Sequence, residues 1–324
     1  MDAQENSKEI EARSRQVYAE LLCDFMFKRL FGSPANKDVL IGFLNMILAD
    51  HQIEDVVFIP TEHLGLTEED RKVIFDISCR CANGETLIIE MQKGFQKHFS
   101  KRALYYTTYP INEQARDARD RFIKAKSEGL TDMQFDWDYN LKPVTVVAIL
   151  NFRFQHTGEW PDDLFRSSYR LREDSTHEIM TDVLRFVFIE LGRFKKRIWE
   201  LETVFDKWIY LLKHMHEMVE IPKEFSDPLF TRLFLLAEID NFTAEEKKQY
   251  LKSLENMGDY NNIINTAVEE AQLKGFATGM EKGMEKGMEK GVKEVARKML
   301  AAGMDEGVIA EMTGLSLDEM ESLK

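Results

Sequence analysis

Residues 71–92 read RKVIFDISCRCANGETLIIEMQ, and they alternate between apolar and polar side chains as the strands of a β-hairpin do. In the first half the odd positions are apolar, and Asp76 stands on an even position. In the second half the odd positions are again apolar, and Glu90 and Gln92 stand on even ones. The alternation therefore predicts two antiparallel strands with one carboxylate on each. The apolar face predicted for the first strand comprises Val73, Phe75, Ile77, Cys79 and Cys81.

The parity of the two apolar sets decides which turn joins the strands. Both sets are odd-numbered, so cross-strand partners must have residue numbers with an even sum. A two-residue loop of Asn83 and Gly84 would pair Ala82 with Glu85, an odd sum, and would set an apolar face against a polar one. A three-residue loop from Ala82 to Gly84, with Gly84 in the left-handed conformation, pairs Cys81 with Glu85 instead. We therefore predict the three-residue turn.

In this register Asp76 lies directly opposite Glu90, and Gln92 is the diagonal neighbour. Directly opposed side chains are about 5 Å apart at Cβ, which suits two carboxylates that share a divalent cation. The pattern is typical of metal-dependent phosphodiester cleavage: Asp76, Glu90 and the main-chain carbonyl of Met91 would hold Mg²⁺ (or Mn²⁺), and Gln92 would orient the attacking water. Solvated acids on the outer face of an edge hairpin would show the same spacing, so the spacing alone leaves both interpretations open.

Composition limits the functions to consider. The chain has 43 basic and 57 acidic residues and a net charge of −14, which counts against a broad phosphate-binding surface but not against a small metal-assisted site. Its three cysteines indicate no disulfide framework, and Cys79 and Cys81 are expected to be buried thiols. No apolar run has membrane-spanning length and no signal peptide is recognisable, so we expect a cytoplasmic protein without a membrane partner.

The order of predicted elements indicates an α/β core with a mixed central sheet within residues 1–160. The elements of that core are expected as helices at 14–31, 36–50 and 95–109, strands at 56–60 and 144–152, and a polar loop at 116–142. A helical region is expected over 161–270, and it includes Phe186, Phe188 and Ile189 in one long amphipathic series.

The C-terminal part has a repeat and a tail. The tetrapeptide GMEK occurs three times in tandem at 279–290, within a segment expected over 271–292. Glycine costs a helix about 1 kcal/mol relative to alanine, so this segment is expected to be a tether, or a helix that forms on a partner. Residues 293–324 are predicted to form a helix-turn-helix-like tail with Asp305 and Ser316 as helix caps. Its acidic surface favours packing or a protein partner over DNA reading.

Several stretches of the chain, taken together, resemble the PD-(D/E)XK nuclease family transposases, the Rpn-type recombination-promoting nucleases of bacteria. The stretches are DFMFKRLFG at 24–32, NKDVLIGFLN at 36–45, DRKVIFDI at 70–77, IEMQ at 89–92 and FSKRALYY at 99–106. The similarity covers roughly residues 20–155, and the tail is of a kind often attached to such proteins. The resemblance implies a restriction-endonuclease-like core and divalent-metal cleavage of DNA in recombination or mobile elements.

Carried over residue by residue, the resemblance makes Asp76 and Glu90 the motif acids. Gln92 takes the position where the wider superfamily has lysine. Asp24 matches an acid of the first helix that often faces the metal, but an i,i+4 ion pair with Lys28 would explain it equally well.

DNA contacts are expected from Arg102, Tyr105 and Lys28. For Arg102 a surface position, and for Tyr105 core packing, is an equally good explanation.

Two functions follow from these observations. The first is a Mg²⁺-dependent DNA endonuclease, and a nuclease that cuts both strands often works as a homodimer. The second is a nuclease-fold protein without catalysis that acts as an interaction or assembly module through its tail.

Overall fold

The computed structural model describes residues 16–50, 52–63, 73–130 and 134–323. Residues 71 and 72 of the predicted hairpin lie outside this part. The chain divides into two compact units, Met1–Asp259 and Tyr260–Lys324.

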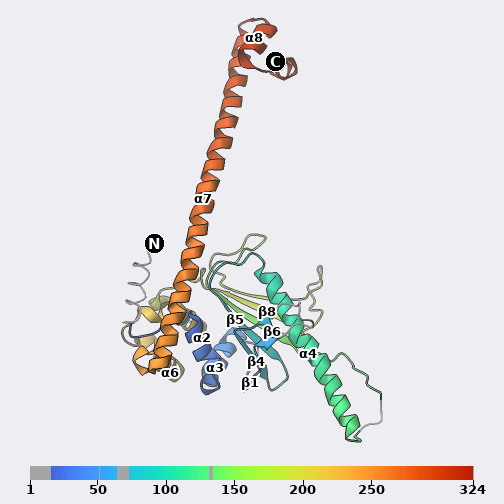
Figure 1. The fold of residues 1–324 in the computed structure, drawn as a ribbon, viewed down its shortest axis with the longest axis vertical. Helices are drawn as coiled ribbons and strands as arrows, with labels where there is room; N and C mark the ends of the chain where they lie inside the picture. The colour runs from blue at the N-terminus through green and yellow to red at the C-terminus, as the bar shows by residue number, and fades with distance from the viewer. Residues whose placement is uncertain (1–15, 51, 64–72, 131–133, 324) are drawn as a thin grey trace. The chain divides into compact units, whose positions relative to one another are not determined.

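The first unit is built on a six-stranded mixed sheet with the order β1-β4-β5-β6-β8-β7 (Figure 1). β5, β6 and β8 run parallel to one another, and the other neighbouring pairs are antiparallel. The strands are β1 (Val56–Phe58), β4 (Ile77–Cys81), β5 (Thr86–Gln92), β6 (Val144–Leu150), β7 (Arg166–Arg170) and β8 (Leu184–Glu190). A separate two-stranded sheet pairs β2 (Glu62–His63) with β3 (Val73–Ile74).

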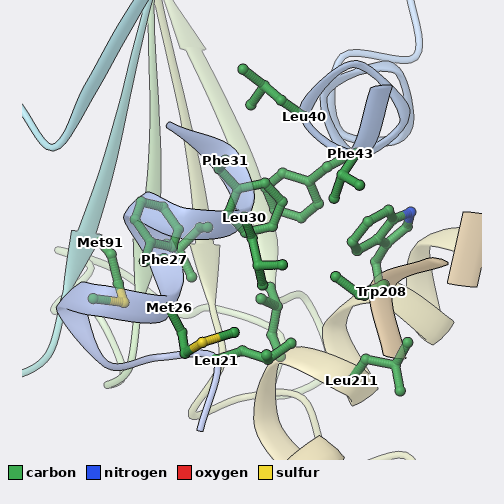
Figure 2. Close-up of a cluster of buried hydrophobic side chains, with 14 of the residues drawn as sticks. Leu21, Met26, Phe27, Leu30, Phe31, Leu40, Phe43, Met91, Trp208 and Leu211 are labelled. Atoms are coloured by element: carbon green, nitrogen blue, oxygen red, sulfur yellow. The ribbon is translucent and has the colours of Figure 1, made fainter. Parts of the chain in front are cut away.

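Helices cover both faces of the large sheet. The larger cluster of buried side chains joins one face to α2 (Asp24–Phe31), α3 (Lys37–Ile47), α5 (Val204–His214) and α6 (Pro228–Ala237). Figure 2 shows part of this cluster, in which the ring of Phe43 stacks on Phe31 at 4.8 Å and lies 5.2 Å from Trp208. The other face packs on α4 (Phe99–Ser127), which crosses the sheet in Figure 1. Both faces of the central strands are therefore dry, and all seven residues of β5 and of β6 are buried.

Short 3-10 helices and a long helix complete the chain. The 3-10 helices are η1 (Pro34–Asn36), η2 (Ile198–Glu200), η3 (Met215–Glu217), η4 (Lys223–Phe225) and η5 (Ile239–Asn241). The long helix is α7 (Ala244–Ala301), which includes the GMEK repeats, and its residues 279–290 are exposed. The second unit ends with α8 (Glu306–Thr313) and α9 (Leu317–Glu321), where Ala296, Ile309 and Met320 form a small core.

The predicted register of the hairpin is confirmed. Ile77 pairs with Ile89 and Cys79 with Leu87, so partner numbers sum to 166 along the ladder. The turn has three residues: the Cys81 N–H donates to the Glu85 carbonyl at 2.8 Å, and Gly84 has φ +89°. Cys79 and Cys81 are buried free thiols, as expected, and Cys23 is a buried free thiol as well.

The prediction that Phe75 and Ile77 share one face is wrong. Phe75 lies in the cluster under α4, whereas Ile77 lies in the cluster on the other side of the sheet. The chain bends at Asp76, between β3 and β4, so the alternation is interrupted there. A bend between two short strands leaves no trace in a hydrophobic pattern, because the apolar residues on its two sides can both be buried.

Three other elements differ from the expectation. Phe186, Phe188 and Ile189 lie in β8 and not in a helix, and the expected division at residue 160 falls inside the sheet. The apolar run Phe186–Ile189 is too short for its periodicity to separate a strand from a buried helix, and parallel pairing with β6 decides its structure. α4 continues to Ser127, through residues expected in a loop, and the helix expected over 14–31 is described as α2, which begins at Asp24.

The predicted caps of the tail are confirmed. Asp305 accepts from the N–H groups of Gly307 and Val308, and Ser316 caps α9 through a reciprocal bond with Glu319. No helix in the described ranges is long and apolar enough to cross a membrane.

Candidate active site

Asp76 and Glu90 are linked across the hairpin by main-chain hydrogen bonds. The N–H of Asp76 donates to Oε1 of Glu90 at 3.2 Å, and the N–H of Met91 donates to Oδ2 of Asp76 at 2.8 Å. At the bend, the N–H groups of Asp76 and Met91 therefore donate to carboxylates and not to carbonyl groups of the neighbouring strand. The predicted pair of facing acids is present, and the hairpin backbone holds both side chains in place.

Burial changes the acidity of both carboxyls. Glu90 is only 3% exposed, and burial, followed by repulsion from Asp76, raises its pKa to about 8. Burial also raises the pKa of Asp76, against the opposing effects of the Met91 N–H and of Lys28. Two buried carboxyl groups this close together disfavour the state in which both are ionised, and a bound cation would stabilise that state.

Gln92 is held at both ends of its amide. Its Nε2 donates to Oε2 of Glu90 at 3.2 Å, and its Oε1 accepts from Nη2 of Arg102 at 2.6 Å. Because arginine only donates and an ionised carboxylate only accepts, these partners set the orientation of the amide. Gln92 therefore orients Glu90, which the sequence did not suggest.

Arg102 belongs to this arrangement through α4. Its guanidinium lies over the rings of Phe99 at 5.5 Å and Tyr106 at 5.6 Å. Its charge is among the causes that lower the pKa of Glu90. The structure thus places Arg102, expected as a DNA contact, behind Gln92 at the carboxylate site.

Asp24 and Lys28 form the ion pair that was one of the two alternatives for Asp24. The Lys28 Nζ lies 3.1 Å from Oδ1 of Asp24, and both side chains are half exposed. Both also act on Asp76, whose pKa Lys28 lowers and Asp24 raises. The first turn of α2 therefore lies beside the site, and metal binding by Asp24 stays a prediction.

The structure brings Tyr106, and not Tyr105, to the carboxylates. Tyr105 is 46% exposed, and its hydroxyl pairs with that of Tyr109 at 2.9 Å. Tyr106 packs on Phe75, and its pKa is raised by burial and then by the charge of Glu90. Its seven-residue spacing from buried Phe99 is the signal that would have identified it, because such positions share one helix face.

The donor set fits a divalent cation bound by few side chains. Within the described ranges no three His, Cys, Asp or Glu side chains gather as a metal cluster. Mg²⁺ commonly uses one or two carboxylates and completes its shell with water and substrate phosphate. The facing carboxylates of Asp76 and Glu90 meet that requirement. Met91 is next to both, because it follows Glu90 in the chain and its N–H donates to Asp76.

The chain matches the models of two known protein families, and the larger match covers most of the first unit. The model of a family described as "PD-(D/E)XK nuclease family transposase" matches residues 21–267, which is more than half of the chain and includes the whole site. The chain belongs to this family. A second model, described as "Rpn/YhgA-like nuclease family, C-terminal HTH domain", matches residues 289–324. No curated protein and no solved structure gives a significant match.

The match confirms the family resemblance drawn from the five sequence stretches. As expected of a PD-(D/E)XK nuclease family transposase, the fold is restriction-endonuclease-like, with a mixed sheet between helices. The match extends well beyond residue 155, in agreement with a first unit that includes β7, β8 and the start of α7. The tail that resembled a helix-turn-helix matches the model of a C-terminal HTH domain over residues 289–324.

Proposed function

We propose that this nuclease-family chain is a divalent-metal-dependent DNA endonuclease that works in recombination or on mobile elements. The observation that carries the proposal is the locked pair of facing carboxylates, Asp76 and Glu90, with raised pKa values. Membership of a nuclease family supports phosphodiester hydrolysis. Against the expectation drawn from the acidic surface of the tail, its match to a helix-turn-helix domain supports DNA as the substrate, because this motif commonly places a helix in the major groove.

In this proposal each residue of the site has a defined task. Asp76 and Glu90 hold Mg²⁺ or Mn²⁺, and a bound ion lowers the pKa of a coordinated water and offsets charge developing on the phosphate. Gln92 keeps one oxygen of Glu90 in place through its Nε2 donor. Arg102 holds Gln92 in turn and adds positive charge near Glu90, where the wider superfamily has a lysine.

Plasmid nicking by the purified full-length chain tests the proposal. We expect cleavage with Mg²⁺ or Mn²⁺, none with EDTA, and none with Asp76→Ala or Glu90→Ala. A matched control is Asp38→Ala, because Asp38 pairs with Arg232 on the surface, away from the hairpin. Cleavage that survives in both site variants would refute the assignment. An inactive wild-type chain that binds no Mn²⁺ would favour the non-catalytic interaction module.

A further inference from the structure

A hollow of about 680 Å³ opens beside the carboxylates, between α2, the end of β5 and the start of α7. Lys28 and Arg29 of α2 line one side, together with Lys93, which directly follows Gln92. Lys252 and Asn256 of α7 line the other side. All these residues belong to the first unit, which ends at Asp259.

Direct contacts fix the two walls of the hollow to each other. The N–H of Phe25 in α2 donates to Oγ of buried Ser253 in α7 at 3.1 Å. Arg29 forms an ion pair with Glu246, and its guanidinium lies 4.7 Å from the ring centroid of Phe242. The start of α7 is therefore part of the core that carries the site, and its exposed side chains have a defined place relative to α2.

The hollow is positive on a chain that is strongly negative. Its lining contains four cationic side chains and one acid, Asp24, whereas the chain as a whole has a net charge of −14. Lys28 and Arg29 are neutralised by Asp24 and Glu246. Lys93 and Lys252 have no ion-pair partner within the described ranges, so two uncompensated cations face one opening.

The hollow lies close to the carboxylate site along the chain and in space, because its lining includes Lys93, the residue after Gln92, and Lys28. Lys28 and Lys93, which line it, both act on Asp76 and lower its pKa. Lys93 directly follows the last residue of β5, Gln92, and lines the hollow together with Lys28 and Arg29 of α2.

We propose that this hollow binds the phosphate backbone of the nucleic acid next to the bond that is cut. Lys93 and Lys252 neutralise phosphates, and the amide of Asn256 donates to a phosphate oxygen. These contacts position the strand and carry no sequence information. The inference rests on the proposed function, since it takes Asp76 and Glu90 as the site of cleavage, and it assigns α7 a role in substrate binding.

Site-specific crosslinking tests this placement. The three native cysteines are buried and have raised pKa values, so a new surface cysteine would be the reactive one. Lys252→Cys in the full chain is labelled with a maleimide photo-crosslinker and irradiated with a fluorescent DNA duplex in EDTA. Lys247→Cys is the control, because Lys247 pairs with Asp240 and lies about 140° around the same helix.

We expect a crosslinked DNA band with the label at position 252 and a band at least tenfold weaker at 247. Equal bands at both positions, or none at 252, would overturn the proposal. This result does not depend on cleavage. If Asp76→Ala and Glu90→Ala still cut DNA, the proposed function fails. If those variants are inactive and position 252 does not crosslink, the placement of the substrate fails and the proposed function stands.

Salt dependence of DNA binding gives a second, independent measurement. Each lysine that neutralises a phosphate contributes about 0.9 to the slope of log K against log salt. Lys252→Gln and Lys93→Gln should each reduce that slope by about 1, and Lys247→Gln should leave it unchanged. Unchanged slopes in the first two variants would contradict phosphate contact by these lysines, whatever the helix-turn-helix domain contributes to affinity.

Discussion

Arg102 Nη2 donates to Oε1 of Gln92 at 2.6 Å, and the other end of the same amide donates to Glu90. A cation on α4 is thereby linked to Glu90 through a neutral side chain. The wider superfamily has lysine at the position of Gln92. In this chain a positive charge still acts on Glu90, but it comes from a helix on the far side of the amide. The presence of Gln92 in place of lysine is therefore no evidence by itself that the site lacks a positively charged side chain.

Arg102→Met should weaken both stability and cleavage. Methionine keeps most of the apolar contact with Phe99 and Tyr106 but leaves Oε1 of buried Gln92 without its donor, which costs about 1–3 kcal/mol. Loss of a group that orients a metal ligand typically reduces activity about 10- to 100-fold. Urea unfolding and plasmid nicking measure the two effects.

Lys101→Met is the matched control for Arg102→Met, because Lys101 is the preceding residue of α4 and is exposed. It should change stability by no more than about 0.5 kcal/mol. Equal effects of the two substitutions would show that the bond to Gln92 has no special weight.

The metal-free protein should lose stability as pH rises from about 4.5 to about 8. The folded chain holds a proton on Glu90 up to a pKa of about 8, whereas the unfolded chain releases it near the ordinary value of 4.5. Between these values the folded state binds more protons, so stability falls with rising pH, by at most about 1.4 kcal/mol per pH unit from this group.

Glu90→Gln removes this titration and should flatten the profile relative to wild type. Its new amide meets the Nε2 donor of Gln92, which lowers stability equally at all pH values, so the slope and not the absolute stability is the test. Urea unfolding at several pH values in EDTA measures it. Parallel profiles for the two proteins would contradict a raised pKa at Glu90.

Mn²⁺ should stabilise the wild-type chain, and more strongly at pH 8 than at pH 6. A ligand at 100 times its Kd stabilises the folded state by about 2.7 kcal/mol, and a proton on Glu90 competes with the metal below a pKa of about 8. Thermal unfolding with and without Mn²⁺ measures the shift. Asp76→Asn keeps an acceptor for the Met91 N–H but should abolish the shift, and an undiminished shift in that variant would place the metal elsewhere.

Gly84→Ala should destabilise the hairpin by about 1–2 kcal/mol, because an alanine in the left-handed region brings its Cβ close to the following carbonyl. Gly84 has φ +89°, and an added Cβ would lie 3.1 Å from Cγ of Lys142. Gly158→Ala is the control, since a Cβ there meets nothing within 4 Å. Thermal unfolding distinguishes them, and a neutral Gly84→Ala would mean that the turn can adopt another geometry.

The sequence was most informative where structure depends on neighbouring residues. Side chains alternate along β4 and β5, so the parity of two short apolar sets was enough to choose a three-residue turn. The same register brings Asp76, at the bend before β4, into contact with Glu90. The caps at Asp305 and Ser316 were predictable for the same reason, because a cap bonds to N–H groups two or three residues away.

Interactions between distant segments could not be read in this way. The run that contains Phe186 and Phe188 became a strand because β6 offered it a parallel partner. The contact of Arg102 with Gln92 depends on how α4 crosses the sheet, which also decides that Tyr106 and not Tyr105 approaches the site. Lys252 joins the basic hollow only because α7 packs on α2 through Ser253.

By itself, then, the sequence determined that two acids face each other on one hairpin, since this follows from a period of two and a short turn. Tertiary structure decided how those acids behave. Burial under α4 raises their pKa values, Arg102 supplies the nearby charge, and α7 adds the lysine opposite α2. Burial and charge at a site depend on all the segments packed around it, and the residue pattern of one strand contains no information about those segments.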